Sequence, residues 1–322
     1  MKKILITGGA GYIGSKFAND MLDKKYKVII VDNLSTGRSK LIPKKSIFYK
    51  CDITNHKLLS KIFALHKPKS VFHFAASISV PESQSNPLKY FKNNVIGTKV
   101  LLDVISKFKI KNFIFSSTCA VYKSKNNKVN EKDERFPENY YGLTKLQCEN
   151  LIELYAKKFK FKYAILRYFN VIGCDNKLRT GQLESKSLFK TIISNFIKKK
   201  KSLNIYGNNY KTHDGTAVRD YIDVNDLSSL HYLAYKFINV KKSIVLNCGY
   251  QKPQSVLDII KIFENVLNTK FTKNYKRNRP GDISSIYADN NFLKKKLPQW
   301  KQKYTTEDSI KNLIKWEEKC LK

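Results

Sequence analysis

Residues 7–15 read TGGAGYIGS, and they follow a short apolar run, KILIT, at residues 3–7. Gly8, Gly11 and Gly14 satisfy the pattern G-x-x-G-x-x-G. Glycines at this spacing permit a tight turn, a close approach of the backbone to a pyrophosphate, and a helix whose N-terminus points at that pyrophosphate. The motif alone is weak, but a strand before it and a helix after it are the context that it requires. The stretch therefore predicts a dinucleotide-binding fold.

A carboxylate ends the second apolar run. This run, KVIIVD, spans residues 27–32, so Asp32 comes 18 residues after Gly14. A carboxylate at this place accepts hydrogen bonds from the adenosine ribose diol and repels a 2′-phosphate. We therefore predict NAD rather than NADP as the cofactor. The alternative for Asp32 is a turn-forming residue before Asn33.

Apolar runs and helical patterns alternate along the first half of the chain. Further apolar runs lie at residues 46–52, 70–76, 112–117 and 162–170, with helical patterns between them. Apolar strands separated by helices predict a parallel sheet that is covered on both faces. We expect an α/β fold, a Rossmann-type doubly wound parallel sheet with a smaller C-terminal α/β substrate lobe.

The chain of 322 residues is long for one core, and the pattern becomes less regular after residue 170. A helix is expected near 186–200, a strand at 202–206 and a helix–strand pair at 226–248. We expect an NAD-binding domain made of residues 1–169 and 224–250, and a second lobe made of residues 170–223 and 251–322.

The formal net charge of +35 suggests a nucleic-acid partner at first sight. Only 7 of the 61 basic residues are arginines, however, and arginine is the residue that reads guanine and grips phosphate as a fork. Abundant Lys, Asn, Ile, Phe and Tyr are typical of AT-rich codon usage. We therefore expect no nucleic-acid partner, although a positive field would raise the encounter rate with an anionic ligand.

Several other classes of protein are not indicated. No segment approaches 18 consecutive apolar residues, so we expect no membrane span. The opening MKKILITGG has too short an apolar run for a signal peptide. The six cysteines form no C-x-x-C pair, which predicts free thiols in a reducing, cytoplasmic setting. The five histidines form no metal-binding spacing, so we expect no metal site.

Residues 138–150 read ENYYGLTKLQCEN, with two adjacent tyrosines and a lysine. The following residues repeat apolar side chains at helical spacing; they are Leu143, Leu146, Leu151, Leu154 and Tyr155. In a helix that begins near Tyr141, Tyr141 and Lys145 are i and i+4 and share a face, whereas Tyr140 points elsewhere. A solvated lysine beside a half-buried tyrosine is the alternative on spacing alone.

The chain resembles the extended short-chain dehydrogenase/reductase family and, within it, the 4-epimerases of UDP-hexoses. The resemblance runs nearly end to end. Its motifs are TGGAGYIGS, VDNLSTG (31–37), CDI (51–53), FAA (74–76), NNVIGT (93–98), FSST (115–118), Tyr141 with Lys145, RYFN (167–170), YGNNYKTHDGTAVRDYI (206–222) and RPGD (279–282). DGTAVRDYI is the motif most specific to the 4-epimerase group.

The resemblance implies roles for individual residues. Tyr141 would be the acid/base group, Lys145 its electrostatic partner, and Thr118 a bridge between the substrate 4-hydroxyl and Tyr141. A phenol titrates near pH 10 in water, and a nearby ammonium together with a positively charged nicotinamide would lower its pKa. The implied cofactor residues are Gly8, Gly11, Tyr12, Ile13, Gly14, Asp32, Asn33, Leu34, Ser35, Thr36, Gly37, Asp52, Ile53, Phe74, Ala75, Ala76, Ser77, Asn93, Thr118, Tyr141, Lys145 and Phe169.

The second lobe would bind the UDP-sugar, and Arg219 and Arg279 match the diphosphate ligands of the family. The implied substrate residues are Thr118, Tyr141, Asn170, Ser187, Leu188, Asn204, Ile205, Tyr206, Arg219, Arg279, Asp282 and Ile286. Ile286 falls where relatives vary in size, and it would border the space in which the sugar turns over. Ordinary strand packing, or a one-residue shift in the alignment, are the alternatives for Ile286.

The implied reaction is the interconversion of UDP-glucose and UDP-galactose through a 4-keto sugar, with NAD as hydride carrier. A dehydratase or decarboxylase of the same superfamily would carry an acidic residue after Thr118, but Cys119 follows it. A non-enzymatic NAD sensor would need neither Tyr141 nor Lys145. The family is usually dimeric through the helices near 87–108 and 141–158, which implies a homodimer. Lys123 and Ser187 depart from the pattern of the family.

Overall fold

The computed structural model describes residues 2–123, 125, 127–183, 187–279 and 282–321. By its internal contacts the chain divides into two units. Unit 1 comprises residues 1–123, 134–168 and 228–246, and unit 2 comprises residues 124–133, 169–227 and 247–322.

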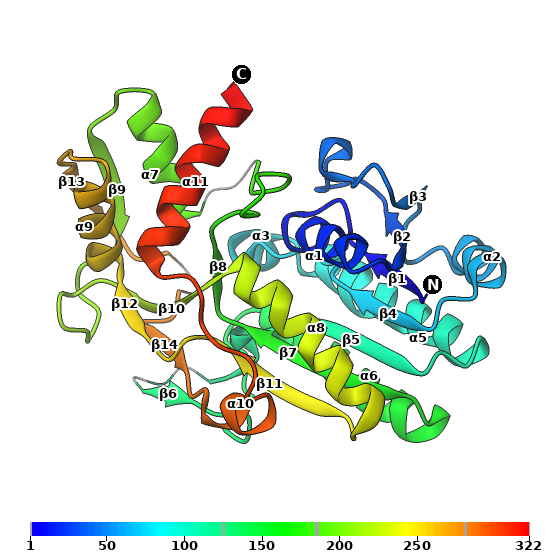
Figure 1. Cartoon of the computed structure of the whole chain (residues 1–322). Coiled ribbons are helices and arrows are strands. Elements are labelled where there is room, and N and C mark those ends of the chain that lie inside the picture. Colours follow the sequence, from blue (N-terminus) through cyan, green and yellow to red (C-terminus); the bar gives the residue numbers. More distant parts are fainter. Residues whose placement is uncertain (1, 124, 126, 184–186, 280–281, 322) are drawn as a thin grey trace. The chain divides into compact units, whose positions relative to one another are not determined.

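Unit 1 is built on a seven-stranded sheet with the order β11-β7-β5-β4-β1-β2-β3 (Figure 1). Its strands are β1 (Lys3–Thr7), β2 (Lys27–Asp32), β3 (Ile47–Lys50), β4 (Ser70–His73), β5 (Asn112–Thr118), β7 (Lys162–Tyr168) and β11 (Ile244–Cys248). The pairs from β3 to β7 are all parallel. The order reverses at β1, as in a doubly wound sheet, so the predicted fold class is confirmed.

Helices follow most of these strands. They are α1 (Tyr12–Asp23), η1 (Ser39–Leu41), α2 (His56–His66), α3 (Val80–Ser85), α4 (Pro87–Tyr90), the π-helical turn η2 (Phe91–Ile96), α5 (Gly97–Lys107), η3 (Cys119–Val121), α6 (Tyr140–Phe159) and α8 (Val224–Val240). The helix predicted near 87–108 is thus present, but a π-helical turn interrupts its middle.

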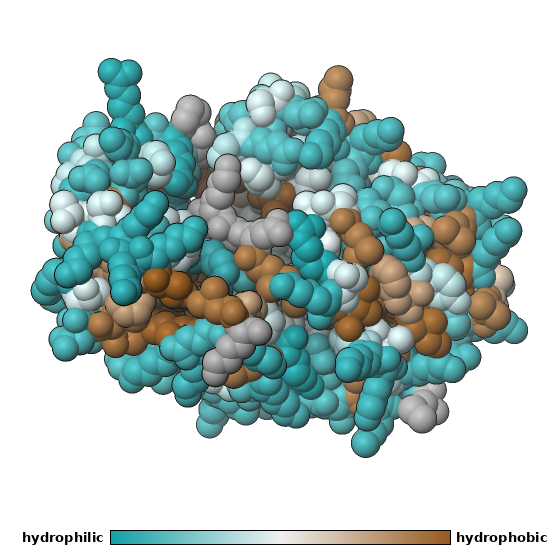
Figure 2. Space-filling view, turned by 90° about the horizontal axis from the view of Figure 1, so that it is seen from above, coloured by the Kyte–Doolittle hydropathy of each residue, from teal (hydrophilic) through white to brown (hydrophobic). Residues whose placement is uncertain are grey.

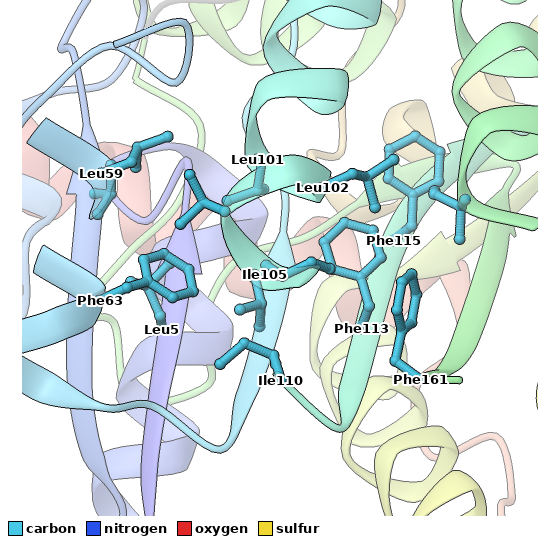
Figure 3. Packing of buried hydrophobic residues seen from close by; sticks show 14 of the residues in the cluster. Leu5, Leu59, Phe63, Leu101, Leu102, Ile105, Ile110, Phe113, Phe115 and Phe161 are labelled. Atoms are coloured by element: carbon cyan, nitrogen blue, oxygen red, sulfur yellow. The ribbon is translucent and has the colours of Figure 1, made fainter. Parts of the chain in front are cut away.

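Alternation of side chains along the strands supplies apolar groups to both faces of the sheet. On one face, Leu5, Phe113 and Phe115 pack in a buried cluster with residues of α2, α5 and α6 (Figure 3). On the other face, the ring of Phe72 lies 4.4 Å from Phe17 of α1 and 5.4 Å from Tyr235 of α8. Each buried aromatic or aliphatic side chain contributes roughly 1.5–3 kcal/mol, so the two layers fix the positions of the strand ends.

Unit 2 contains two smaller sheets. The larger follows the path β12-β10-β14-β6, with β8 also paired to β10, and the smaller is the parallel pair β13-β9. The strands are β6 (Lys128–Val129), β8 (Asn170–Ile172), β9 (Ser202–Tyr206), β10 (Val218–Asp223), β12 (Pro253–Ser255), β13 (Thr272–Lys276) and β14 (Ser285–Ala288). The helices are α7 (Leu188–Ile197), α9 (Val256–Val266), α10 (Asn291–Lys296) and α11 (Thr306–Leu321).

The run predicted as one strand at 162–170 forms two strands. β7 ends at Tyr168, and after Phe169 the chain continues as β8, whose Asn170 lies opposite Tyr221 of β10 in unit 2. The sequence does not signal this break, because no glycine or proline interrupts the run KYAILRYFN.

Residues 124–133 lie in unit 2, although the predicted NAD-binding domain included them. The reason is the pairing of β6 with β14, in which Lys128 lies opposite Tyr287. The Nδ2 group of Asn247 also donates to the Val129 carbonyl at 2.9 Å. The other boundaries of the units fall at residues 168/169, 227/228 and 246/247, whereas the prediction placed them at 169/170, 223/224 and 250/251.

Across the described residues, no helix is both long and apolar enough to cross a membrane. The face seen in Figure 2 is covered mostly by hydrophilic side chains, as expected from the 61 basic residues of the chain.

Candidate active site

The glycine-rich loop of unit 1 has no room for a side chain at Gly8 or at Gly14. Gly8 has a φ of +73°, and a Cβ atom there would lie 2.5 Å from the backbone nitrogen of Ala75. A Cβ atom at Gly14 would lie 2.2 Å from the Gly8 carbonyl oxygen. The loop therefore lies directly against the FAAS segment after β4 (residues 74–77), which brings together two of the predicted cofactor segments.

The N-terminus of α1 follows this loop. Gly11 is its N-cap residue, no side chain caps the helix, and no acidic residue lies in its first turn. The backbone N–H groups of Tyr12, Ile13 and Gly14, at such an N-terminus, suit a pyrophosphate by hydrogen bonding and by the helix dipole. These features fit the phosphates of a dinucleotide.

The carboxylate of Asp32 lies at the centre of the adjacent loops. One oxygen accepts the backbone N–H of Ala10 at 3.0 Å, and the other accepts that of Leu34 at 2.8 Å. Burial raises the pKa of Asp32, while these two hydrogen bonds oppose the rise. A Cβ atom at Gly37 would lie 2.9 Å from the same carboxylate, so glycine is needed there too.

The other predicted adenosine-side residues form a second small network. Asn33 donates from its side-chain nitrogen to Asp52 at 2.8 Å and accepts the backbone N–H of Ser35 at 3.0 Å. Burial acts to raise the pKa of Asp52, but hydrogen bonds from Thr54 and Asn33 outweigh it and hold the pKa below its ordinary value. Ile53 is buried and Thr36 is exposed.

The π-helical turn η2 carries Asn93 and Asn94. The side-chain oxygen of Asn94 accepts the backbone N–H of Ser77 at 2.8 Å and the side-chain N–H of Asn93 at 3.0 Å. Its side-chain nitrogen donates to the Ser77 carbonyl at 3.0 Å and to the Thr144 hydroxyl at 3.1 Å. Asn94, which was not predicted as a site residue, therefore links the FAAS segment to α6.

Thr118, Tyr141 and Lys145 meet at the end of β5. The hydroxyls of Tyr141 and Thr118 are hydrogen-bonded. Lys145 is only 2% exposed, and its ammonium donates to the Ser116 carbonyl at 2.8 Å and lies 4.7 Å from the centre of the Phe115 ring. The structure brings these three residues together within unit 1.

The two adjacent tyrosines of α6 are not equivalent. Tyr141 is half-buried and its backbone N–H donates to the Ser83 hydroxyl at 3.1 Å, whereas the side chain of Tyr140 is 46% exposed. Tyr141 and Lys145 both lie within α6 at i and i+4, so they share a face of the helix as predicted. Of the residues predicted as an apolar stripe, Leu151 and Tyr155 pack against the core cluster, whereas Leu143 and Leu154 are exposed.

Burial dominates the electrostatics at this place. It raises the pKa of Tyr141, and the hydrogen bond from Thr118 opposes the rise. This direction is opposite to the lowered pKa expected from the Lys145 ammonium and a bound nicotinamide. Burial also lowers the pKa of Lys145 to about 8, while Cys148 and Glu149 act to raise it.

In unit 2, the predicted uracil-side residues divide between the two faces of β9. Asn204 and Tyr206 lie on the exposed face, and Ile205 is buried on the other, so only its backbone can meet a ligand. The guanidinium of Arg279 lies 4.0 Å from the centre of the Tyr206 ring, which brings a predicted diphosphate residue to a predicted uracil residue. Of the RPGD motif, Pro280 and Gly281 lie outside the described residues.

The second predicted diphosphate residue, Arg219, lies on β10 opposite Ile286 of β14. Arg219 donates to the Val218 carbonyl at 2.9 Å. Ile286 is 1% exposed. Asp282 is exposed, and its backbone N–H donates to the Arg279 carbonyl at 3.2 Å.

Ser187 and Leu188 form the start of α7. The Ser187 hydroxyl is the helix cap, accepting the Lys190 N–H, and it donates to the Gln182 side chain at 2.9 Å. Phe169 is buried and Asn170 is exposed at the start of β8. Ser187 thus has a structural role of its own beside the ligand role that the resemblance implied.

Tyr210 is a residue that the sequence did not point to. Its hydroxyl is buried and has no hydrogen-bond partner among the residues that the structure describes. Burial raises the pKa of Tyr210, Asp282 adds to the rise, and Arg219 and Arg279 act to lower it. Tyr210 is the second of two tyrosines in the segment YGNNY (206–210), and this spacing does not predict that its hydroxyl is buried.

One group of residues has ligand atoms close enough for a metal ion in the described part of the chain. It consists of His213, Asp214 and Asp258. Asp214 already accepts from Thr216 and Ser255, and Asp258 completes the capping box of α9. These contacts give the carboxylates structural roles.

The glycine loop, the acidic strand end and the Thr–Tyr–Lys set define a dinucleotide-dependent enzyme on a doubly wound fold. The family described as "NAD dependent epimerase/dehydratase family" matches residues 4–249. The chain belongs to this family.

Named relatives agree with this placement. The UDP-glucose 4-epimerase of Azospirillum brasilense is 34% identical over 98% of this chain and 92% of its own. A UDP-glucose 4-epimerase structure from Stenotrophomonas maltophila, with bound NAD and formylated UDP-arabinopyranose, has a TM-score of 0.94 at 32% identity and covers 100% of this chain and 99% of its own. The Bifidobacterium longum UDP-glucose 4-epimerase, in complex with NAD+ and UDP, has a TM-score of 0.92 at 32% identity, with 99% and 98% covered.

Proposed function

We propose that this chain is a UDP-glucose 4-epimerase that interconverts UDP-glucose and UDP-galactose. The observation that carries the proposal is the hydrogen bond between Thr118 and Tyr141, with the buried Lys145 one helical turn further along α6. Such a set can move a proton to and from a hydroxyl that is held at Thr118. The 34% identity to a UDP-glucose 4-epimerase over nearly the whole chain supports the choice of substrate.

Bound NAD would supply hydride chemistry at C4 of the sugar, accepting a hydride and returning it to the opposite face. Tyr141 takes the proton of the 4-hydroxyl through its contact with Thr118, and it returns a proton after the 4-keto sugar has turned. Lys145 supplies a positive charge that favours the phenolate form of Tyr141. Gly8, Gly14 and Asp32 would hold the pyrophosphate and the adenosine ribose.

A sugar that turns over during the reaction must be held by another part of the molecule. We assign this role to the UDP group and place its contacts in unit 2. Arg219 and Arg279 would bind the diphosphate, because a guanidinium matches phosphate oxygens in charge and geometry. Tyr206, stacked on Arg279, would border the uracil. The unpartnered Tyr210 hydroxyl is a further candidate donor near these arginines.

The proposal includes a homodimer and a cytoplasmic location. A homodimer is supported by the apolar side chains that α4, η2 and α6 expose; these are Leu88, Phe91, Ile96, Leu143 and Leu154. Dimerisation would cover this apolar surface. A cytoplasmic location is supported by the scattered cysteines, for which the structure shows no disulfide among the described residues.

The test is conversion of UDP-galactose to UDP-glucose by the purified protein without added NAD. We expect steady turnover until the two sugars reach equilibrium. Release of a dehydrated sugar would indicate a dehydratase, and NAD binding without turnover of any UDP-sugar would indicate a sensor. Either result would contradict the proposal.

A further inference from the structure

A buried carboxylate lies behind the proposed proton-transfer group. Glu149 of α6 has no solvent exposure, and one of its oxygens accepts from the Ser117 hydroxyl at 2.5 Å and from Nε of Arg167 at 3.0 Å. Its other oxygen accepts from Nη2 of Arg167 at 2.7 Å and from Nη1 of Arg135 at 3.5 Å. Ser117 and Arg167 are direct partners across β5 and β7. Glu149 therefore ties two strands of the sheet to α6.

The network continues past the end of β5. Nη1 of Arg167 donates to the Tyr122 hydroxyl at 2.7 Å, and the guanidinium lies 4.9 Å from the centre of the Tyr122 ring. Tyr122 comes directly after the turn η3 that follows Thr118. The strand that carries Thr118 is thus held on both sides of that residue, by Ser117 before it and by Tyr122 after it.

Glu149 also lies one helical turn beyond Lys145, at i+4, and two turns beyond Tyr141. Residues at this spacing share a face of the helix. A buried ion pair such as Glu149–Arg167 gives little net stabilisation over apolar residues of the same size, because both charges must leave water. The role of this ion pair is to fix the positions of β5, β7 and α6 and the charge beside Thr118, Tyr141 and Lys145.

The charged and titratable groups around Lys145 come from several elements. Cys148 and Glu149 on α6 act to raise its pKa against the effect of burial. His73 of β4 faces it in neutral form, because burial and the Lys145 charge lower the pKa of His73 to about 3. From β5 come the Ser116 carbonyl and the Phe115 ring, which carry no charge. Among these described groups around Lys145, Glu149 is the one that carries a carboxylate.

We propose that Glu149 is a positioning residue that holds Thr118 and the Tyr141–Lys145 face of α6 in register and supplies the negative charge facing the Lys145 ammonium. The inference rests on the proposed function. Lys145 acts while it is charged, so activity falls as the pH rises through its pKa. Loss of the Glu149 charge lowers that pKa further, and the alkaline limb of the kcat profile moves to lower pH.

The experiment compares kcat and KM from pH 6 to pH 10 for the wild type and four variants with confirmed folding and NAD content. Glu149→Gln combined with Arg167→Met removes both buried charges together and avoids leaving one unpaired. Glu149→Asp keeps the charge but shortens the side chain, and Ser117→Ala removes one bond to the strand. Glu153→Gln, one turn further along α6, is the matched control.

The double variant is expected to lose about 10- to 100-fold in kcat, the scale of a displaced group, with little change in KM. Its alkaline limb should move to lower pH, by less than loss of the Glu149 charge alone would give, because loss of the Arg167 cation acts in the opposite direction. Glu149→Asp and Ser117→Ala should lower kcat without moving the limb, and Glu153→Gln should match the wild type.

If the wild type is an active epimerase, two results would overturn the inference about Glu149 and leave the proposed function standing. One is a folded double variant with the kcat and alkaline limb of the wild type. If the double variant does not fold, the result that would overturn the inference is an unchanged kcat in both Glu149→Asp and Ser117→Ala. A wild type that does not interconvert the two sugars overturns the proposed function and the inference together.

Discussion

The guanidinium carbon of Arg279 lies 4.0 Å from the centre of the Tyr206 ring, so the two side chains stack. The stack holds a long, flexible cation in one orientation before any ligand arrives. Tyr206 and Arg279 come from segments more than 70 residues apart in the sequence, and the pairing of β9 with β13 brings these segments together.

The stack gives a first prediction. Arg279→Lys should raise KM for UDP-galactose by about tenfold with little change in kcat, because a lysine neither stacks in the same way nor binds two phosphate oxygens as a fork. Steady-state kinetics measure both constants. Arg277→Lys, two residues earlier and exposed, is the control and should behave as the wild type. A larger effect on kcat than on KM would contradict a binding role.

The second prediction concerns the adjacent tyrosines. Tyr141→Phe should lower kcat by at least about 10²-fold with little change in UDP-sugar binding, the usual scale for a general acid/base group. Tyr140→Phe should do much less, since Tyr140 is exposed. Kinetics together with calorimetric titration of UDP-sugar would separate chemistry from binding. A more damaging Tyr140 variant would show that the assignment of roles is wrong.

The third prediction concerns the cofactor. NAD should co-purify with the wild type, because loss of NAD in mid-cycle would strand a keto sugar. Asp32→Asn should reduce the NAD content of the purified protein, since it weakens the acceptor for the ribose and for the Ala10 and Leu34 N–H groups. Nucleotide released by denaturation can be quantified by chromatography. Asp23→Asn, at the exposed end of α1, is the control. A fully active wild type without bound nucleotide would contradict this prediction.

The fourth prediction concerns sugar specificity. The wild type should prefer UDP-galactose to UDP-N-acetylgalactosamine, because the stiff, β-branched Ile286 would limit the space for a 2-acetamido group. Ile286→Gly should narrow the difference in kcat/KM. Because Ile286 is buried, the variant should also lose about 2–5 kcal/mol of stability, which thermal unfolding would measure. Ile286→Val is the control for stability. Equal efficiency on both substrates in the wild type would reject this role.

The sequence predicted the parts of the fold that local patterns encode. The glycine loop, the strands at 3–7 and 27–32, and the placement of Tyr141 with Lys145 on one helix face all follow from spacing over a few residues. The apolar stripe of α6 was predicted only in part. Leu151 and Tyr155 pack against the core, but the buried face of this helix also carries Lys145 and Glu149. These two charged residues can be buried because they have polar partners on other segments, and the spacing of residues in α6 does not predict those partners.

Contacts between distant segments account for the features of the fold and of the site that the sequence did not predict. Glu149 meets Arg167 across 18 residues, and Asn94 meets Thr144 across 50, and neither pair has a signature in the chain. The break at Phe169 and the transfer of residues 124–133 to unit 2 likewise depend on which strand lies beside which. Such features are set by the assembled sheets rather than by any stretch of sequence.

The π-helical turn at Phe91–Ile96 acts as a fixed phase shift in an otherwise continuous helical rod. Each residue in an α-helix advances the direction of the side chains by about 100°, and a π-helical turn holds the equivalent of one additional residue. The turn therefore sets the rotational phase of α5 independently of that of α4. Deleting one residue from it would turn Asn94 by about a quarter of a revolution relative to α4 or α5, and Ser77 and Thr144 would lose the amide that links them.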